Sequence, residues 1–310
     1  MVRIIGFLVG LGFAGILMIS MATDLTTYFT STHEATAEHE FHLHPRDAGL
    51  PTDGLLGTFD KAQLQRGLKV YTEVCSGCHA ISRVHFYDLQ QLGYNEGQVK
   101  SYAANEWKIE VPSINPDTGE AATRKATPAD FFPSPYANEV AARAANNNAL
   151  PPDLSLMAKA RHDGANYIYS LLTGYRNQPA ELLAKFPAAK TPQGLHYNPY
   201  FANLNLAMPA PLTSEGQVSY EAEGSPKPTV DQMAKDVSAF LQWTAEPKLG
   251  DRKRAGLTVL IFLLIATVLG YMAYQNVWAE AKRKVAAKGP LEPENKTKRN
   301  RAKNKAGIEG

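Results

Sequence analysis

The two cysteines of this 310-residue chain are separated by only two residues, and a histidine follows the second one directly. The pattern, Cys75-Ser76-Gly77-Cys78-His79, is typical of covalent haem attachment. Each thiol can form a thioether with a haem vinyl group, while the next residue presents an imidazole to the iron. We therefore predict one covalently bound haem c, attached through Cys75 and Cys78, with His79 as an axial ligand.

Three other uses of two close cysteines fit the sequence less well. A thioredoxin-like redox pair needs a neighbouring strand-helix unit and gives no role to His79. A structural zinc site needs more ligands than this motif offers, and a disulfide that closes such a short loop stabilises little. The pattern therefore favours haem over a redox pair, a zinc site or a plain disulfide.

A second axial ligand has to come from elsewhere, and three methionines lie outside the hydrophobic ends of the chain: Met157, Met208 and Met233. Met233 falls on the apolar stripe of an expected helix, and Met157 lies beside leucines, so both are expected to pack in a core. Met208 lies in a proline-rich loop whose stiff backbone could hold a thioether over the iron. We predict Met208 as the ligand, with His162 and His196 as alternatives that would give a lower redox potential.

Haem propionates are negatively charged, and arginine is well shaped to bind a carboxylate through two hydrogen bonds. Arg143 is the best candidate from the sequence, because residues 141–148 are otherwise nearly free of charge. Tyr136 and Tyr200 could hydrogen-bond or pack at the haem edge, although a buried aromatic residue is more often ordinary core packing.

Both ends of the chain carry long apolar runs. Residues 4–22 read as a signal peptide or an amino-terminal anchor, and small residues at Ala22 and Ala37 offer possible cleavage sites, so we expect removal. Residues 256–278 contain no charged side chain and are long enough for a transmembrane helix. The tail after it is rich in Lys and Arg, which indicates a cytoplasmic tail and a haem domain in the periplasm of an inner membrane. A basic tail next to a transmembrane helix is more simply explained as a determinant of membrane orientation and a contact with anionic lipids than as a nucleic-acid binding segment.

The middle of the chain predicts a mainly α-helical domain. Helical periodicity is clear at 60–74 and 229–245, whereas 111–136 and 187–228 are rich in Pro, Gly and Asn and predict loops around a small helical core. A polar lead-in contains four histidines, which fit no helix-based metal site well. The expected organisation comprises a signal or anchor (1–22), the lead-in (23–54), the haem domain (55–250), the transmembrane helix (256–278) and the tail (279–310).

Several further segments match one family in order. They are residues 74–79, 132–136, 141–148, 150–155, 195–201, 207–209 and 232–237. Together they resemble the bacterial type of the cytochrome c1 family, from the ubiquinol:cytochrome c reductase complex, over about residues 55–278. The resemblance implies a cytochrome c-like helical fold with large loop insertions, followed by a carboxy-terminal transmembrane helix.

The resemblance also implies roles for particular residues and partners. By motif position it assigns His79 and Met208 as axial ligands and Arg143 as a propionate partner, and it places Pro151 in the segment that packs at the haem. The implied partners are cytochrome b, a Rieske iron-sulfur protein and a cytochrome c, assembled in a dimeric complex. Residues 23–250 carry 18 basic and 25 acidic groups, a balance that suits a basic cytochrome c.

This chain departs from its bacterial relatives in one respect. Such relatives often have an additional disulfide near the haem-ligand loop, and the sequence leaves no cysteine to make one. We hypothesise that proline stiffening, with packing by Tyr197, Tyr200 and Phe201, holds the Met208 loop instead.

The sequence therefore predicts a non-catalytic electron-transfer subunit of an oxidoreductase complex. Two alternatives remain open at this point. A free-standing membrane-anchored cytochrome that donates to a terminal oxidase would use the same haem, and a haem enzyme or gas sensor would need an open iron position.

Overall fold

The computed structural model describes residues 2–30 and 36–286 of the chain. His33 of the lead-in and most of the basic tail, residues 287–310, lie outside the described residues. Contacts divide the chain into two compact units, Met1–Ala48 with Lys61–Ala245, and Gly49–Asp60 with Glu246–Gly310. The first unit contains the Cys75 motif.

The core of the first unit is the crossing of α3 (Lys61–Val70) and α9 (Val230–Ala245), which correspond to the two helices predicted from periodicity. The helices touch at Gly67, where an added Cβ would lie 2.1 Å from the carbonyl oxygen of Asp236. Beside this contact, the guanidinium of Arg66 binds the fully buried carboxylate of Asp236, with an Nε–Oδ2 distance of 2.9 Å. A buried carboxylate needs such a partner, so the ion pair helps to fix how the helices cross.

Five buried aromatic side chains pack against this crossing. They are Tyr71, Phe86, Trp107, Phe132 and Phe240. The ring planes of Tyr71 and Trp107 are nearly parallel, and the Phe86 and Phe132 rings stack with centroids 4.1 Å apart. These aromatic side chains form the core next to the segment in which α3 leads into the cysteine motif.

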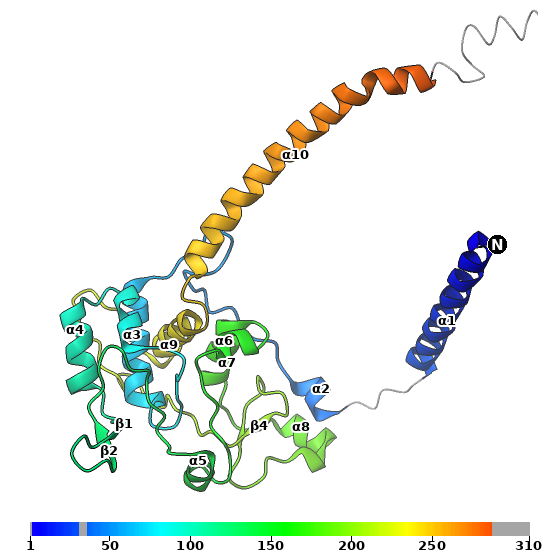
Figure 1. Ribbon diagram of the computed structural model, residues 1–310. Coiled ribbons are helices and arrows are strands. Elements are labelled where there is room, and N and C mark those ends of the chain that lie inside the picture. The colour runs from blue at the N-terminus through cyan, green and yellow to red at the C-terminus, as the bar shows by residue number, and fades with distance from the viewer. Residues whose placement is uncertain (1, 31–35, 287–310) are drawn as a thin grey trace, which may run out of the picture. The chain divides into compact units, whose positions relative to one another are not determined.

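The remaining regular structure of this unit is short, and the mainly α-helical fold class predicted from the sequence is confirmed (Figure 1). Further α-helices are α2 (Ala37–Phe41), α4 (Glu96–Ser101), α5 (Glu139–Ala145), α6 (Met157–Ala160), α7 (Gly164–Leu172) and α8 (Ala180–Lys185). Short 3-10 or π-helical segments lie at Phe86–Leu92, Tyr102–Glu106 and Pro187–Ala189. Two small antiparallel sheets pair β1 (Val111–Ile114) with β2 (Ala121–Arg124) and β3 (His196–Tyr197) with β4 (Asn205–Leu206). Both sheets lie in segments for which the sequence predicted loops only.

Helix α1 (Val2–Thr30) extends beyond the apolar run that ends at residue 22. Its threonine hydroxyls donate to carbonyls of the preceding turn, as Thr23 does to Ser20 and Thr30 to Thr26. The helix is long and apolar enough to cross a membrane, as a signal sequence near an amino terminus also can be.

The second unit consists of residues 49–60 and the long helix α10 (Leu249–Ala286). The Lys253 ammonium donates to the carbonyls of Thr52 and Gly54, both at 2.6 Å, and so joins the two parts of this unit. Residues 249–279 of α10 are long and apolar enough to span a membrane, and they include the span predicted at 256–278.

Candidate functional site

The cysteine motif follows directly from the end of α3. The helix widens into a π-helical turn over Tyr71–Cys75, and the amides of Cys78 and His79 then both donate to the Cys75 carbonyl, at 3.1 and 2.9 Å. This tight turn brings both thiols and the imidazole close together. The Tyr71 hydroxyl donates to the His79 carbonyl at 2.8 Å, which ties the turn to the aromatic core.

The orientation of His79 is set by its contact with Pro152. The Nδ1 atom of His79 lies 2.8 Å from the Pro152 carbonyl oxygen. Because a carbonyl can only accept, Nδ1 carries the hydrogen and Nε2 keeps its lone pair for a metal. Burial lowers the pKa of His79, and the Pro152 bond and the Asp153 charge offset this only in part. The imidazole is therefore neutral at pH 7, as an iron ligand must be.

The segment that contains Pro152 is joined to the residues after His79 by several hydrogen bonds. The Leu154 amide donates to the Ala80 carbonyl at 2.8 Å, and the Asp153 carboxylate accepts from the amide and the hydroxyl of Ser82. Burial opposes ionisation of Asp153, but these bonds and those from Ser155 outweigh it and lower its pKa. Pro152 therefore belongs to a rigid support for the histidine.

The Cys75 thiol lacks the lowered pKa of a redox-active cysteine. Burial raises the pKa of Cys75 to about 12, with a smaller contribution from Cys78. Reactive cysteines of thioredoxin-like pairs have a lowered pKa, because the thiolate is the nucleophile. In the described residues, no group of three or more His, Cys, Asp or Glu side chains could hold a metal ion. The two thiols and the neutral imidazole fit a covalently attached haem.

Helix α5 and the turn after it lie on the Cys78 side of this site. The Asn146 amide donates to the Tyr136 hydroxyl at 2.9 Å. This bond lowers the pKa of Tyr136, but burial and the nearby Cys78 thiol outweigh it, so the pKa is raised overall. Tyr136 therefore lies next to Cys78, a predicted attachment residue. Arg143 is exposed, and its guanidinium donates to the Asn148 carbonyl at 3.0 Å, across a turn in which two asparagines have positive φ.

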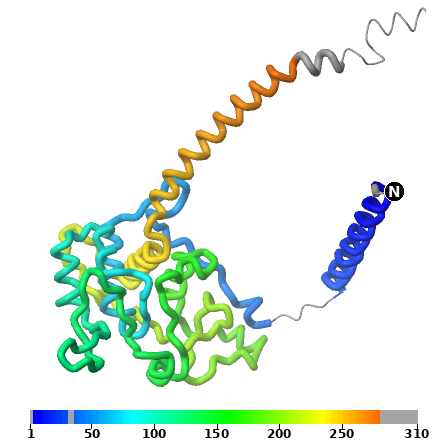
Figure 2. The backbone as a smooth tube through the Cα atoms, in the orientation of Figure 1, coloured from blue at the N-terminus to red at the C-terminus, as the bar shows by residue number. Residues whose placement is uncertain are grey.

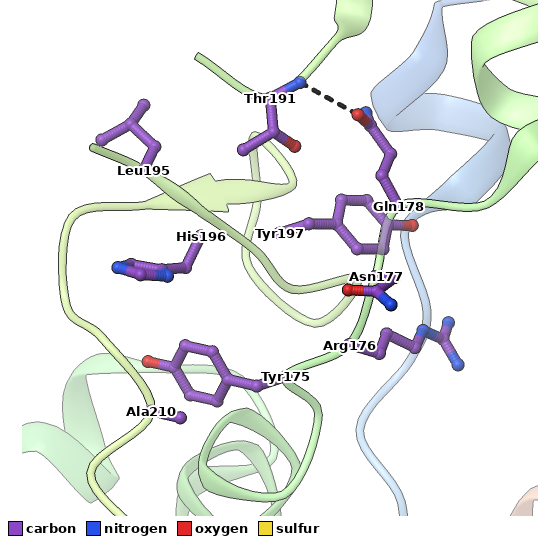
Figure 3. A pocket seen from close by; sticks show the side chains of 9 residues that line it. All are labelled: Tyr175, Arg176, Asn177, Gln178, Thr191, Leu195, His196, Tyr197 and Ala210. Atoms are coloured by element: carbon purple, nitrogen blue, oxygen red, sulfur yellow. Dashed lines mark hydrogen bonds between the residues drawn. The ribbon is translucent and has the colours of Figure 1, made fainter. Parts of the chain in front are cut away.

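Met208 belongs to a second group of contacts in the same unit. Its side chain is half-buried, and its main-chain carbonyl accepts a hydrogen bond from the Tyr175 hydroxyl at 3.0 Å. Tyr175 and Ala210 also line a cavity of about 450 Å³ beside the Met208 loop, where Figure 3 shows His196 and Tyr197 on neighbouring walls. The loop is therefore held by its backbone on one side and open to a cavity on the other.

The remaining candidates lie in different surroundings. Tyr200 is buried and its ring lies under the guanidinium of Arg46, while Pro151 is half-buried next to the residue that binds His79. Met233 is fully buried in α9, as expected of a core residue. His162 and His196 are both exposed, and Met157 is half-buried at the first residue of α6.

Sequence reasoning missed a cation in the Met208 group. Burial raises the pKa of Tyr167, and the positive charge of the nearby Arg161 guanidinium offsets the rise only in part. Tyr167 in turn raises the pKa of Tyr175, after burial, and Tyr175 binds Met208. Arg161 stands beside His162 in a polar stretch, and its spacing alone does not distinguish it from a solvated surface residue.

We expect Arg161→Ala to lower the redox potential more than Arg143→Ala does. A nearby cation disfavours the oxidised, more positive haem, and its removal should lower the potential by something on the order of 50 mV at an effective dielectric constant near 20. Redox titration of the purified complex measures both changes. An equal or larger fall for Arg143→Ala would instead support the assignment made from the sequence.

A small, mainly α-helical domain whose first core helix ends in a Cys-x-x-Cys-His turn, with a half-buried neutral imidazole, has the architecture of a c-type cytochrome. Residues 50–281 match the Cytochrome C1 family. Cytochrome c1 of Rhodospirillum rubrum is 44% identical over 238 residues, which cover 74% of this chain and 85% of that protein. The chain therefore belongs to the cytochrome c1 family, and the resemblance inferred from its sequence is confirmed.

Two eukaryotic relatives are similar over still more of the chain. The Arabidopsis thaliana protein named "Cytochrome c1 1, heme protein, mitochondrial" is 43% identical over 261 residues, covering 84% of this chain and 80% of its own length. The Candida albicans protein named "Cytochrome b-c1 complex catalytic subunit, mitochondrial" is 39% identical over 274 residues, covering 88% and 89%. Family membership and the long apolar α10 together identify a membrane-anchored protein.

Proposed function

We propose that this chain is the haem c electron-transfer subunit of a quinol:cytochrome c oxidoreductase complex. The observation that carries the proposal is the half-buried, neutral His79 beside the two cysteines. Its Nδ1 binds the Pro152 carbonyl, which leaves Nε2 available for the iron. A bound haem c would supply one-electron chemistry, in which the iron gains one electron from a donor and loses one to an acceptor.

The residues of this chain would attach, orient and tune that group. Cys75 and Cys78 would form the two thioethers, and His79 and Met208 would be the axial ligands. A histidine-methionine pair raises the potential into a range suited to electron transfer. Tyr136, next to Cys78, and Arg161 or Arg143 would contact the edge of the ring and its propionates, with Pro151 and Tyr200 as further packing residues.

Family membership supports part of the proposed set of partners. A relative named as a subunit of the cytochrome b-c1 complex supports cytochrome b as a neighbour. We infer a Rieske iron-sulfur protein as the electron donor and a cytochrome c as the acceptor, in a dimeric complex. The acidic balance of residues 23–250 favours a basic acceptor.

The same proposal includes a topology. The positively charged residues that follow α10 favour a cytoplasmic tail in a bacterial inner membrane, with the haem domain in the periplasm. The expected organisation remains a signal or anchor (1–22), a lead-in (23–54), a haem domain (55–250), a transmembrane helix (256–278) and a tail (279–310).

Purification from membranes through a tag on this chain tests the proposal. We expect a pyridine haemochrome spectrum with both b-type and c-type haem, together with the electron paramagnetic resonance signal of a Rieske cluster. A preparation with c-type haem alone, still able to reduce a terminal oxidase, would support the alternative of a free-standing cytochrome.

A further inference from the structure

The lead-in, which the sequence predicted only as an extended polar segment, packs closely on distant parts of the haem domain. Residues 36–48 run from α2 along α7 and the β3-β4 hairpin, as the blue and green stretches of the tube in Figure 2 show. These residues are more than 100 positions away from their contacts in sequence. We call residues 36–48 the clasp.

The first part of the clasp is anchored by apolar contacts. Ala37 is 5% exposed and joins a cluster with Leu182 of α8 and with Tyr197 and Leu204 of the β3-β4 hairpin. Phe41 packs edge-on against Phe186, with ring centroids 6.3 Å apart. The Thr36 hydroxyl caps α2 by accepting from the His39 amide. Signal cleavage after Ala37 would remove Thr36 and Ala37 from this anchor, whereas cleavage after Ala22 would leave it intact.

The second part of the clasp is held by polar contacts. The Arg46 guanidinium lies over the rings of Tyr169 and Tyr200, 5.2 and 5.5 Å from their centroids, and donates to the Thr173 hydroxyl. The Arg46 amide donates to the Ser170 hydroxyl at 2.7 Å. Arg46 therefore joins α7, which contains Tyr169 and Ser170, to the hairpin segment, which contains Tyr200.

The hairpin held in this way leads directly to Met208. The Leu43 amide donates to the Pro199 carbonyl at 2.8 Å, and the fully buried Asn198 binds both the Leu171 carbonyl and the Tyr200 amide. Strand β4 ends at Leu206, two residues before Met208. Any movement of the hairpin relative to α7 would therefore displace the methionine.

We propose that the clasp positions the Met208 loop, and that Arg46 is its central positioning residue. The proposal rests on the proposed function, in which Met208 is an axial ligand of the haem. The clasp gives the lead-in a structural role. It also explains how the Met208 loop is held in place without an additional disulfide, since the chain has no cysteine beyond the two of the haem motif. The sequence suggested packing by Tyr197, Tyr200 and Phe201. Tyr197 belongs to the cluster around Ala37 and the Tyr200 ring faces Arg46, whereas Phe201 is only half-buried.

The test compares three variants of the full chain, purified with its haem and complex. Arg46→Ala removes the link between α7 and the hairpin, and Ala37→Asp places a charge in the apolar anchor. His44→Ala, an exposed residue of the same segment, is the matched control. Two readouts report on the methionine: the sulfur-to-iron charge-transfer band of the oxidised protein and carbon monoxide binding by the reduced protein.

We expect Arg46→Ala to raise the methionine-dissociated fraction about tenfold, equivalent to about 1.4 kcal/mol. The charge-transfer band should weaken and carbon monoxide binding should increase, while His44→Ala matches the wild type. Arg46→Lys, which keeps a cation over the two rings, should restore most of the band. If Ala37→Asp does not retain haem, the Arg46 variants still decide the question.

Wild-type behaviour of both readouts in Arg46→Ala would overturn the proposal. Met208→Leu is measured in the same series, because loss of the band in that variant alone would show a correct ligand without a clasp. An unchanged band in Met208→Leu would overturn the ligand assignment, and the clasp proposal with it.

Discussion

Replacing Gly67 with alanine is expected to destabilise the haem domain by about 3 kcal/mol or more, a large share of the roughly 5–15 kcal/mol that holds a typical domain together. The added Cβ would lie 2.1 Å from the Asp236 carbonyl oxygen and 2.6 Å from the Phe240 Cβ. The nearest atom belongs to the backbone of α9, so no side-chain rotation can relieve the clash. Helices α3 and α9 would have to separate, which would weaken the Arg66–Asp236 ion pair between them.

Denaturant unfolding, followed through the haem absorption of the purified protein, measures this effect. Gly97→Ala in α4 is the matched control, because its added Cβ would meet only the end of the Asn95 side chain, at 3.3 Å. That change should alter the free energy of unfolding by no more than about 1 kcal/mol, the range of helix propensity. A Gly67→Ala protein as stable as the control would show that the two helices can move apart at little cost.

The contact at Gly67 also illustrates what the sequence could predict. Apolar periodicity was enough to locate the helices at 60–74 and 229–245, because an amphipathic helix carries its own signal. The pairing of the two helices carries no such signal. It depends on one small residue facing a backbone carbonyl 169 positions later in the chain.

In the functional site, too, some residues could be predicted from the sequence and others could not. Cys75, Cys78 and His79 fall within five consecutive residues, so the sequence alone predicts their chemistry. The structure adds the Pro152 carbonyl that orients the imidazole. The sequence alone does not distinguish Arg161 from other exposed arginines. Its expected effect on the redox potential depends on its neighbours Tyr167 and Tyr175 beside the Met208 loop. Arg143 stood out through a lack of charged neighbours, which says nothing about what its guanidinium binds.

The lead-in was the least predictable part of the domain. Its Pro and Gly residues correctly indicated little regular structure, and in the described residues only the short α2 interrupts the irregular chain between 36 and 60. An irregular segment can still be tightly packed when distant residues supply its partners, as Tyr169, Ser170 and Tyr200 do for Arg46. Local composition predicts the absence of a helix, but it does not predict the absence of contacts.

Replacing Met208 with leucine is expected to lower the haem redox potential by more than about 0.1 V, within the range of roughly 0.8 V over which axial ligands set haem potentials. Leucine fills a similar volume but offers no sulfur lone pair, so the reduced iron loses the ligand that favours it. The open position should also bind carbon monoxide, which the six-coordinate wild type binds poorly.

Redox titration and carbon monoxide difference spectra of the purified complex measure both effects, and two other methionines provide the controls. Met233→Leu tests a fully buried core position, and Met157→Leu tests a half-buried one at the start of α6. Both control variants should keep the wild-type potential, because volume-conserving exchanges cost little in a core. A fall with Met157→Leu and none with Met208→Leu would move the ligand to α6. The Tyr175 hydroxyl bond to the Met208 carbonyl would then have only a structural role.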